Sequence, residues 1–286
     1  MRFVFRDASG AWRNGWKILG FAGLMTVGAL GVILAWVMTP EEVRRVLPEP
    51  YWALGVTLLV SWVCVRLERQ PLTSLGLRLD STWLREVALG TVGGVMLIGL
   101  VALGVWLAGG FSLVRTWDDG AGVILRSAWL MLGVALFEEL AFRGYVFQRL
   151  TRGVGSRWAQ GLMAVVFCLA HPFGGEMATS MKVVAMLNTF LAGLMLGLCY
   201  VRTRSLALPV GVHLGWNWWM NCLGFGVSGN ALTGVWTPEF SGKPEWLSGG
   251  RYGLEASVVC TAVLVLTVVG LMSWKGTEPR DVTAHA

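Results

Sequence analysis

Residues 121–148 read AGVILRSAWLMLGVALFEELAFRGYVFQ, an apolar run interrupted by a short polar motif. About 20 apolar residues in a helix are enough to cross a hydrocarbon core ~30 Å thick, so this stretch predicts a membrane-spanning helix. It is longer than one crossing needs, and we expect the helix to continue past the membrane surface or to be tilted. The motif places Glu138, Glu139 and Arg143 within the span. Ionisable groups at membrane depth are costly and are kept mainly where they line a site or a polar cavity.

Apolar character extends along nearly the whole chain. Of the 286 residues, 55% are hydrophobic and 14% are charged, whereas about 25% are charged in soluble proteins. We therefore predict an all-α fold, a polytopic transmembrane helical bundle that forms a single integral membrane domain over residues 1–286. About eight spans are expected, at residues 18–38, 51–66, 86–109, 121–148, 157–171, 182–201, 206–225 and 255–274. The first span is too long for the core of a signal peptide, so we expect it to be retained.

The basic residues fall mostly on one side of these predicted spans. If the N-terminus is cytoplasmic, most Lys and Arg residues flank the cytoplasmic ends of the spans, and those on the other side are Arg44, Arg45, Arg115, Lys182, Lys243 and Arg251. Cytoplasmic loops carry an excess of Lys and Arg, so we predict that both termini are cytoplasmic. The scattered arrangement of the basic residues differs from the clustered basic face that binds phosphates, and we expect no nucleic-acid partner.

The spacing of the polar motif indicates different roles for its two carboxylates. In a helix, Glu139 and Arg143 are i,i+4 neighbours on one face and can pair. Glu138 is rotated by about 100° from Glu139, which makes it a poorer partner for Arg143. We therefore predict that Arg143 holds Glu139 ionised, while Glu138 faces a water molecule or a second polar group. The alternative interpretation is an ion pair that only braces the helix.

Two histidines lie in later apolar segments, each with a partner four residues away. Phe167 precedes His171 and His213 precedes Asn217 at this spacing, so each pair presents one helix face. At a rise of ~1.5 Å per residue, both histidines, Asn217 and Glu138 fall in the middle portion of the membrane. Unrelated polar residues would not be expected to share one level, so we predict that these residues line a common buried cavity.

Other polar and sulfur-containing residues receive structural interpretations. A single membrane histidine often packs without a catalytic role, and Asn188 and Asn221 are interpreted as residues that hydrogen-bond between helices. The five cysteines lie in apolar segments without CxxC spacing and are interpreted as small buried hydrophobes. This pattern favours neither a disulfide framework nor a thiolate metal site.

The motifs resemble those of the CPBP family, intramembrane proteins that include type II CAAX prenyl endopeptidases and bacterial Abi-type relatives. The resemblance spans about residues 70–225, which we take as the catalytic core. Three family motifs are matched in order by Glu138-Glu139-x-x-x-Arg143, Phe167-x-x-x-His171 and His213-x-x-x-Asn217. The resemblance implies an intramembrane endopeptidase that cleaves a peptide bond with a glutamate-activated water molecule.

The resemblance also implies roles for the individual residues. Glu138 with His171 would activate the water, while His213 with Asn217 would stabilise the oxyanion. Glu139 and Arg143 would complete the catalytic set by shaping the site. We further predict that the substrate pocket contains Phe142, Phe167 and Trp216.

The implied partners are the lipid bilayer and a membrane-anchored or lipidated peptide or protein substrate. An apolar anchor brings a scissile bond to membrane depth at little cost, because each buried methylene contributes about 0.8 kcal/mol. We expect the substrate to reach the site from the cytosolic side or laterally from the bilayer. The protein is expected to be a multi-pass protein of a bacterial or archaeal cell membrane.

Alternative chemistries and functions stay open at this point. We expect no cofactor, and zinc is the alternative because two histidines and a glutamate are acceptable catalytic ligands, although the HExxH spacing is absent. A non-proteolytic, Abi-like self-immunity or scaffold protein could carry the same motifs. An ion- or proton-coupled transporter also places ionisable residues at mid-membrane, but it would often show paired repeats that this sequence lacks.

Overall fold

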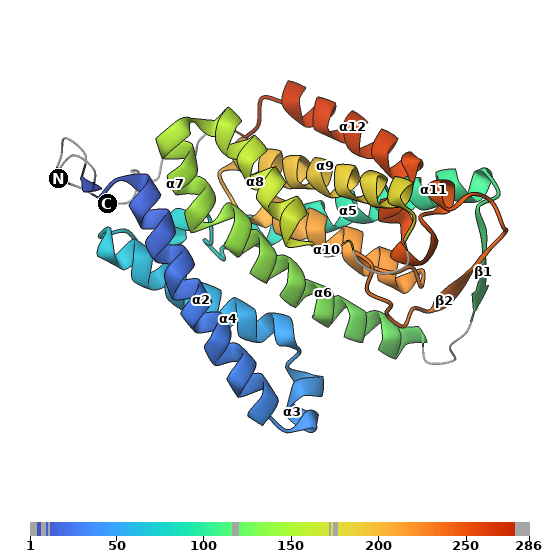
Figure 1. The fold of residues 1–286 in the computed structure, drawn as a ribbon, viewed down its shortest axis with the longest axis horizontal. Coiled ribbons are helices and arrows are strands. Elements are labelled where there is room, and N and C mark those ends of the chain that lie inside the picture. Colours follow the sequence, from blue (N-terminus) through green and yellow to red (C-terminus); the bar gives the residue numbers. More distant parts are fainter. Residues whose placement is uncertain are drawn as a thin grey trace.

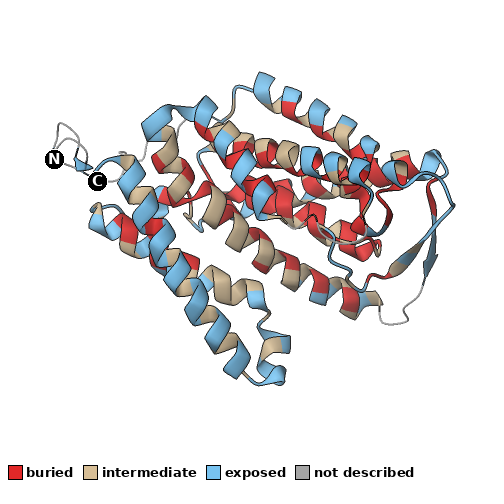
Figure 2. Cartoon of the chain, in the orientation of Figure 1, coloured by how far each residue is buried: buried red, intermediate tan, exposed pale blue. Residues whose placement is uncertain are grey.

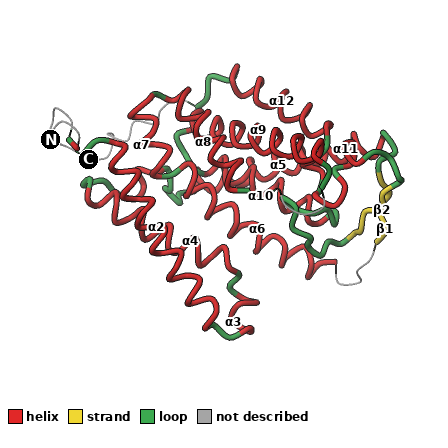
Figure 3. Tube along the Cα trace, in the orientation of Figure 1, coloured by secondary structure: helices red, strands yellow, loops and turns green. Residues whose placement is uncertain are grey.

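The computed structural model describes residues 5–6, 10, 12–115, 120–171, 173 and 177–277. Helices make up most of this part of the chain, with one short strand pair (Figures 1 and 3). The α-helices are α2 (Asn14–Met38), α3 (Glu41–Val46), α4 (Glu49–Leu67), α5 (Ser81–Leu107), α6 (Gly120–Arg143), α7 (Tyr145–Val154), α8 (Ser156–Ala170), α9 (Thr179–Thr203), α10 (Ala207–Cys222), α11 (Glu245–Ser248) and α12 (Val258–Ser273). Strands β1 (Phe111–Arg115) and β2 (Trp236–Phe240) pair antiparallel, and the short 3-10 helices are η1 (Leu72–Leu75), η2 (Gly250–Tyr252) and η3 (Leu254–Ala256).

The long helices run back and forth between two ends of the bundle (Figure 1). One end carries the β1–β2 pair and residues 223–257, and we call it the hairpin end. The other, called the turn end, carries the connections at residues 68–80, 144, 155 and 204–206. The start of α2 and the residues after α12 also lie at the turn end, since Asn14 is close to Gly153 and Thr277 donates to the carbonyl of Arg202.

The centre of the bundle is the crossing of α5 and α10, which glycines bring into backbone contact. A Cβ atom at Gly215 would lie 2.0 Å from the carbonyl oxygen of Thr91, and one at Gly94 would lie 2.2 Å from that of Val212. Small residues spaced four apart let membrane helices approach closely, and Gly90-x-x-x-Gly94 and Gly211-x-x-x-Gly215 both have this spacing. This crossing therefore fixes the position of α10.

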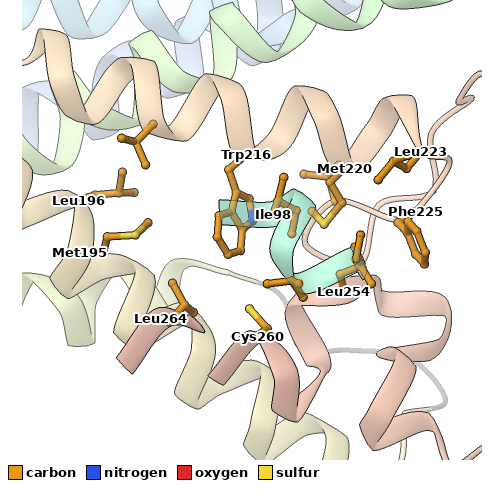
Figure 4. Packing of buried hydrophobic residues seen from close by; sticks show 14 of the residues in the cluster. Ile98, Met195, Leu196, Trp216, Met220, Leu223, Phe225, Leu254, Cys260 and Leu264 are labelled. Carbon is orange, nitrogen blue, oxygen red and sulfur yellow. The ribbon is translucent and has the colours of Figure 1, made fainter. Parts of the chain in front are cut away.

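A buried apolar cluster packs against this crossing (Figure 4). Trp216 and Met220 of α10 face Ile98 of α5, and all three side chains are nearly or fully buried. Leu254 of η3 and Cys260 and Leu264 of α12 close the cluster. The hydrophobic core thus surrounds the C-terminal half of α10, next to the residues predicted to be catalytic.

The stretch 121–148 departs from the prediction of one continuous helix. Helix α6 ends at Arg143 and α7 begins at Tyr145, with Gly144 between them at φ −75° and ψ −121°. A Cβ atom at Gly144 would lie 2.2 Å from the carbonyl oxygen of Leu140, so the turn leaves no room for a side chain. Residues 121–148 are therefore divided between two helices, whereas the sequence predicted one helix that is tilted or continues past the membrane surface.

The outer helices are held to the bundle at the turn end by a polar cluster. The carboxylate of Glu68, just after α4, accepts hydrogen bonds from Lys17 of α2 at 3.0 Å and from Arg149 of α7 at 2.8 Å. Tyr145 of α7 donates to the same carboxylate. Away from this cluster α2 is exposed or half-buried along its length, with Phe21 as its buried residue (Figure 2).

Five helical stretches in the described residues are long and apolar enough to cross a membrane: Asn14–Met38, Glu49–Leu67, Ser81–Leu107, Gly120–Val154 and Thr179–Thr203. The predicted spans 157–171, 206–225 and 255–274 correspond to the shorter helices α8, α10 and α12. The mostly helical fold agrees with the prediction, while the count of eight spans and the cytoplasmic position of both termini stay predictions.

Candidate active site

The two adjacent carboxylates of α6 have different surroundings. Glu139 is fully buried, and its Oε1 atom accepts a hydrogen bond from Nη1 of Arg143 at 2.9 Å. Arg143 is 2% exposed and also donates from Nη2 to the carbonyl of Gly193 on α9 at 3.1 Å. The i,i+4 pair expected from the sequence is thus present, and it joins α6 to α9 as well.

Phe167 lies at the centre of the aromatic contacts in the site. The guanidinium of Arg143 lies over its ring at 4.5 Å, a distance suited to a cation–π interaction. The ring of Phe142 meets it edge-on at 5.0 Å between centroids, and the ring of His171 lies 4.5 Å away. Phe167 therefore packs against the Arg143 guanidinium, Phe142 and His171 at once.

His213 of α10 is oriented by Glu139. Its Nδ1 atom lies 2.8 Å from Oε1 of Glu139, and because an ionised carboxylate only accepts hydrogen bonds, Nδ1 is the donor. This contact turns the Nε2 atom of His213 towards Glu138, whose Oε2 atom is 3.9 Å away. The sequence spacing gave no indication of the Glu139–His213 contact, because it joins two helices far apart in the chain.

His171 lies one residue beyond the end of α8, which corrects the expectation of a shared helix face with Phe167. The helix ends at Ala170, and His171 has extended backbone angles, φ −91° and ψ 136°. The following residue is Pro172, and a residue before proline is disfavoured in the helical region. Nδ1 of His171 lies 2.7 Å from the carbonyl oxygen of Phe167, so Nδ1 donates and Nε2 points elsewhere, 4.0 Å from Oε2 of Glu138.

The Oε2 atom of Glu138 is the point on which both imidazoles converge. It is buried and has no hydrogen-bond partner among the described residues. Its distances to Nε2 of His171 and of His213 are 4.0 and 3.9 Å, beyond direct hydrogen-bonding range. Polar groups at such a separation are commonly bridged by a water molecule.

Asn217 lies one helical turn after His213 on α10 and is 5% exposed. No hydrogen bond joins its side chain to another residue in the described part of the chain. A buried carboxamide that faces a cavity in this way can donate to a ligand oxygen. The structure thus brings together all six residues predicted to be catalytic.

Two cavities meet at the histidines. A wide cavity of about 500 Å³ is lined by Glu138, Phe142 and other residues of α6, and by residues 227, 228, 230 and 232 of the hairpin end. A narrow cavity of about 40 Å³ is lined by Phe167, Trp216 and residues of α9 and α12. The lining that the two cavities share consists of His171, His213, Asn217 and Ser228. The narrow cavity has room for a few water molecules, while the wide one can hold part of a peptide.

Glu255 is a residue of the cavity wall that sequence reasoning missed. It lies in η3, and its carboxylate accepts hydrogen bonds from Nε1 of Trp216 at 3.1 Å and from the backbone N–H of Ser228 at 2.7 Å. It lines the narrow cavity beside the catalytic candidates. The signal available in the sequence was an acidic residue at the first position of the predicted span 255–274.

Asn188 and Asn221 connect helices, as the sequence predicted. Asn188 of α9 donates to the carbonyls of Glu255 and Ser257 and accepts from Thr261 of α12. Asn221 of α10 donates to the hydroxyl of Ser127 on α6 at 2.7 Å. The five cysteines are buried, which agrees with their interpretation as small hydrophobes.

No group of three or more His, Cys, Asp or Glu side chains within the described ranges has an arrangement that could hold a metal ion. Glu138, His171 and His213 approach one another at one point, where the positions of both histidines are set by their Nδ1 hydrogen bonds. The expectation of a metal-free reaction stays a prediction.

The fold and the site define a helical integral membrane protein in which a carboxylate and two imidazoles converge in a buried cavity. Residues 120–219 match a protein-family model described as Type II CAAX prenyl endopeptidase Rce1-like. This match confirms the predicted resemblance to the CPBP family over that segment, which contains the three motifs. Among curated proteins, none matches the chain.

Proposed function

We propose that this protein is a membrane-embedded endopeptidase that hydrolyses a peptide bond with a water molecule activated by Glu138 and His171. The observation that carries the proposal is the convergence of both Nε2 atoms on the unpartnered Oε2 of Glu138. The match of residues 120–219 to a protease family supports it independently.

The proposed first step is attack of water on the substrate carbonyl. Nδ1 of His171 donates to the Phe167 carbonyl, which leaves a lone pair on Nε2 to accept from the water. As the water oxygen bonds to the carbonyl carbon, the water proton moves to the Glu138 carboxylate. General-base assistance of this kind typically contributes a factor of about 10²–10⁴ in rate.

The oxyanion that forms is proposed to be stabilised by Asn217 and His213. The Asn217 carboxamide has donors that are free of other described residues, and they lie in the lining shared by the two cavities. Because Nδ1 of His213 donates to Glu139, its Nε2 atom can donate to the oxyanion only when the ring carries both protons. Glu139, held by Arg143, would support that form electrostatically. Collapse of the intermediate breaks the C–N bond, and the leaving amine takes the proton from Glu138.

The test is cleavage of a synthetic peptide library fused to one transmembrane anchor, by the purified protein in lipid nanodiscs. Glu138→Gln removes the proton acceptor while nearly keeping the shape, so we expect cleavage to become undetectable and the melting temperature to stay within a few degrees of wild type. Glu239→Gln, an equivalent change in β2 outside both cavities, is the matched control and should cleave normally. Cleavage by Glu138→Gln at the wild-type rate would refute the mechanism, and a stable wild type without any cleavage would favour the scaffold or self-immunity alternative.

A second arm of the test addresses the anchor and the metal. We propose that the substrate is membrane-anchored or lipidated, so the anchored library should be cleaved faster than the same peptides without an anchor. We also propose that no metal is required, so a chelator should leave the rate unchanged. Equal cleavage of anchored and free peptides would contradict the first statement. Loss of activity with chelator, restored by added zinc, would contradict the second.

We further propose that the protein crosses the membrane about eight times, with the five long apolar stretches joined by α8, α10 and α12, and that it resides in a bacterial or archaeal cell membrane. Helix α10 would then be a short span enclosed by its neighbours, and α8 and α12 would be short spans that also face lipid. The excess of basic residues at the turn end supports a cytoplasmic location for that end.

A further inference from the structure

The two ends of the bundle contribute unequally to the cavities at the site. Residues 227, 228, 230 and 232 of the hairpin end line the wide cavity, and Glu255 of the same end lines the narrow one. The connections of the turn end, at residues 68–80, 144, 155 and 204–206, contribute no residue to either lining. The site is thus closed towards the turn end by helices and bordered by loop residues at the hairpin end.

The exposed part of the wide cavity's lining lies at the hairpin end as well. Two of its residues are exposed, Ala170 at the end of α8 and Asn230 in the loop after α10. The polar loop residues Ser228 and Asn230 belong to irregular backbone, and such backbone does not occur against lipid in the hydrocarbon region; it is tolerated where it is buried in protein or lines a water-filled cavity. A lining of this kind therefore indicates a route for water from the hairpin end to Glu138.

The charges assign the two ends to opposite sides of the membrane. The turn end carries most of the Lys and Arg residues, including Arg69, Arg78, Arg152, Arg157 and Arg204. The hairpin end carries few basic residues: Arg115 in β1, and Lys243 and Arg251 in residues 223–257. By the positive-inside rule, the turn end is cytoplasmic and the hairpin end is not.

We infer that the active-site cavity opens to the non-cytoplasmic side of the membrane. The substrate class that follows rests on the proposed function. It consists of membrane-anchored proteins whose scissile bond lies in an exported segment close to the anchor. A lipidated C-terminus that stays in the cytoplasm would be on the wrong side of the bundle. This departs from the cytosolic access expected from the sequence, and the reason is the position of residues 227–232 in the cavity wall.

The experiment is labelling of single added cysteines by a membrane-impermeant maleimide in spheroplasts of a bacterial host. The native cysteines are all buried, which keeps the background low. Asn230→Cys reports the cavity rim and Val134→Cys its wall on α6. Ser156→Cys, exposed at the turn end, and Leu30→Cys, exposed on the lipid-facing α2, are the controls.

We expect Asn230→Cys and Val134→Cys to be labelled at least tenfold more than Ser156→Cys in intact spheroplasts. Ser156→Cys should react only after lysis, and Leu30→Cys in neither condition, because a thiol in lipid does not form the reactive thiolate. Labelling of Asn230→Cys only after lysis would overturn the orientation. Labelling of Asn230→Cys without Val134→Cys, in a variant that melts like wild type, would overturn the opening. Since labelling needs no turnover, failure of the endopeptidase proposal would leave these outcomes unchanged.

Discussion

Helices α10 and α2 are both apolar, yet they occupy opposite kinds of surroundings. Twelve of the sixteen residues of α10 are buried, including His213 and Asn217. Of the 25 residues of α2, Phe21 is the buried one, and the rest of the helix is exposed or half-exposed (Figure 2). The longer and more uniformly apolar helix is therefore the peripheral one, and the shorter helix carries the chemistry.

The contrast shows what stabilises a membrane helix bundle. Lipid tails are as apolar as leucine, so apolar residues gain little by leaving lipid for a neighbouring helix. Helix α10 is held instead by backbone-to-backbone approach at glycines and by polar contacts such as that of His213 with Glu139. Helix α2 leaves most of its surface exposed and packs along one side only, with Gly28 against Val56 of α4, Phe21 against Tyr145 of α7, and Lys17 paired with Glu68.

The largest effect on stability is expected from Arg143→Ala, which removes the buried ion pair with Glu139. Two Arg–Glu ion pairs at i,i+4 spacing are present in the described residues, Arg143–Glu139 inside the bundle and Arg45–Glu41 in exposed α3. Removing Arg143 leaves the Glu139 charge buried, and we expect the free energy of unfolding to fall by about 3–5 kcal/mol. Arg45→Ala should change it by less than about 1 kcal/mol. Thermal melting in detergent measures both.

A double variant sharpens this prediction. Adding Glu139→Gln to Arg143→Ala removes the uncompensated charge, so the double variant should melt at a higher temperature than Arg143→Ala alone. If the double variant is no more stable than the single one, the buried pair does not have the energetic role assigned to it.

A smaller effect is expected at the α5–α10 crossing. Gly215→Ala places a Cβ atom 2.0 Å from the Thr91 carbonyl oxygen, so the helices must separate. Overpacking of this kind typically costs about 1–3 kcal/mol, and the shift should lower cleavage because His213 and Asn217 move with α10. Gly93→Ala, on α5 with no neighbouring atom within 4 Å, is the matched control and should be neutral. Equal melting temperatures for the two variants would show that the crossing is not tightly packed.

The smallest effect is expected on α2. Leu30 is 59% exposed on a helix that faces lipid, and its truncation removes few protein contacts. Leu30→Ala should change the free energy of unfolding by less than about 0.5 kcal/mol, as expected for a surface substitution. A loss comparable to that of Gly215→Ala, measured in the same melting assay, would mean that α2 packs against a further protein surface.

Much of the site followed from local spacing. The i,i+4 relation of Glu139 and Arg143 predicted their pairing, and it left Glu138 as the freer carboxylate, which is how the structure has them. The three motifs also predicted which segments would meet. The break at Gly144 was missed because an isolated glycine in an apolar run is compatible with a continuous helix, and a clash with the Leu140 carbonyl becomes apparent only in the folded backbone.

The sequence by itself determined the helical membrane fold and the residue types of the site. The hydropathy of a segment indicates whether it lies in lipid or in water, and helix periodicity indicates which residues share a face. Both can be read from neighbouring residues in the chain. Only the tertiary structure decided that Glu139 orients His213, that Glu255 enters the cavity wall, and that loop residues 227–232 border the site. Each of these contacts joins residues far apart in the chain, and its geometry depends on how closely the helices pack and where the connecting segments fold back between them.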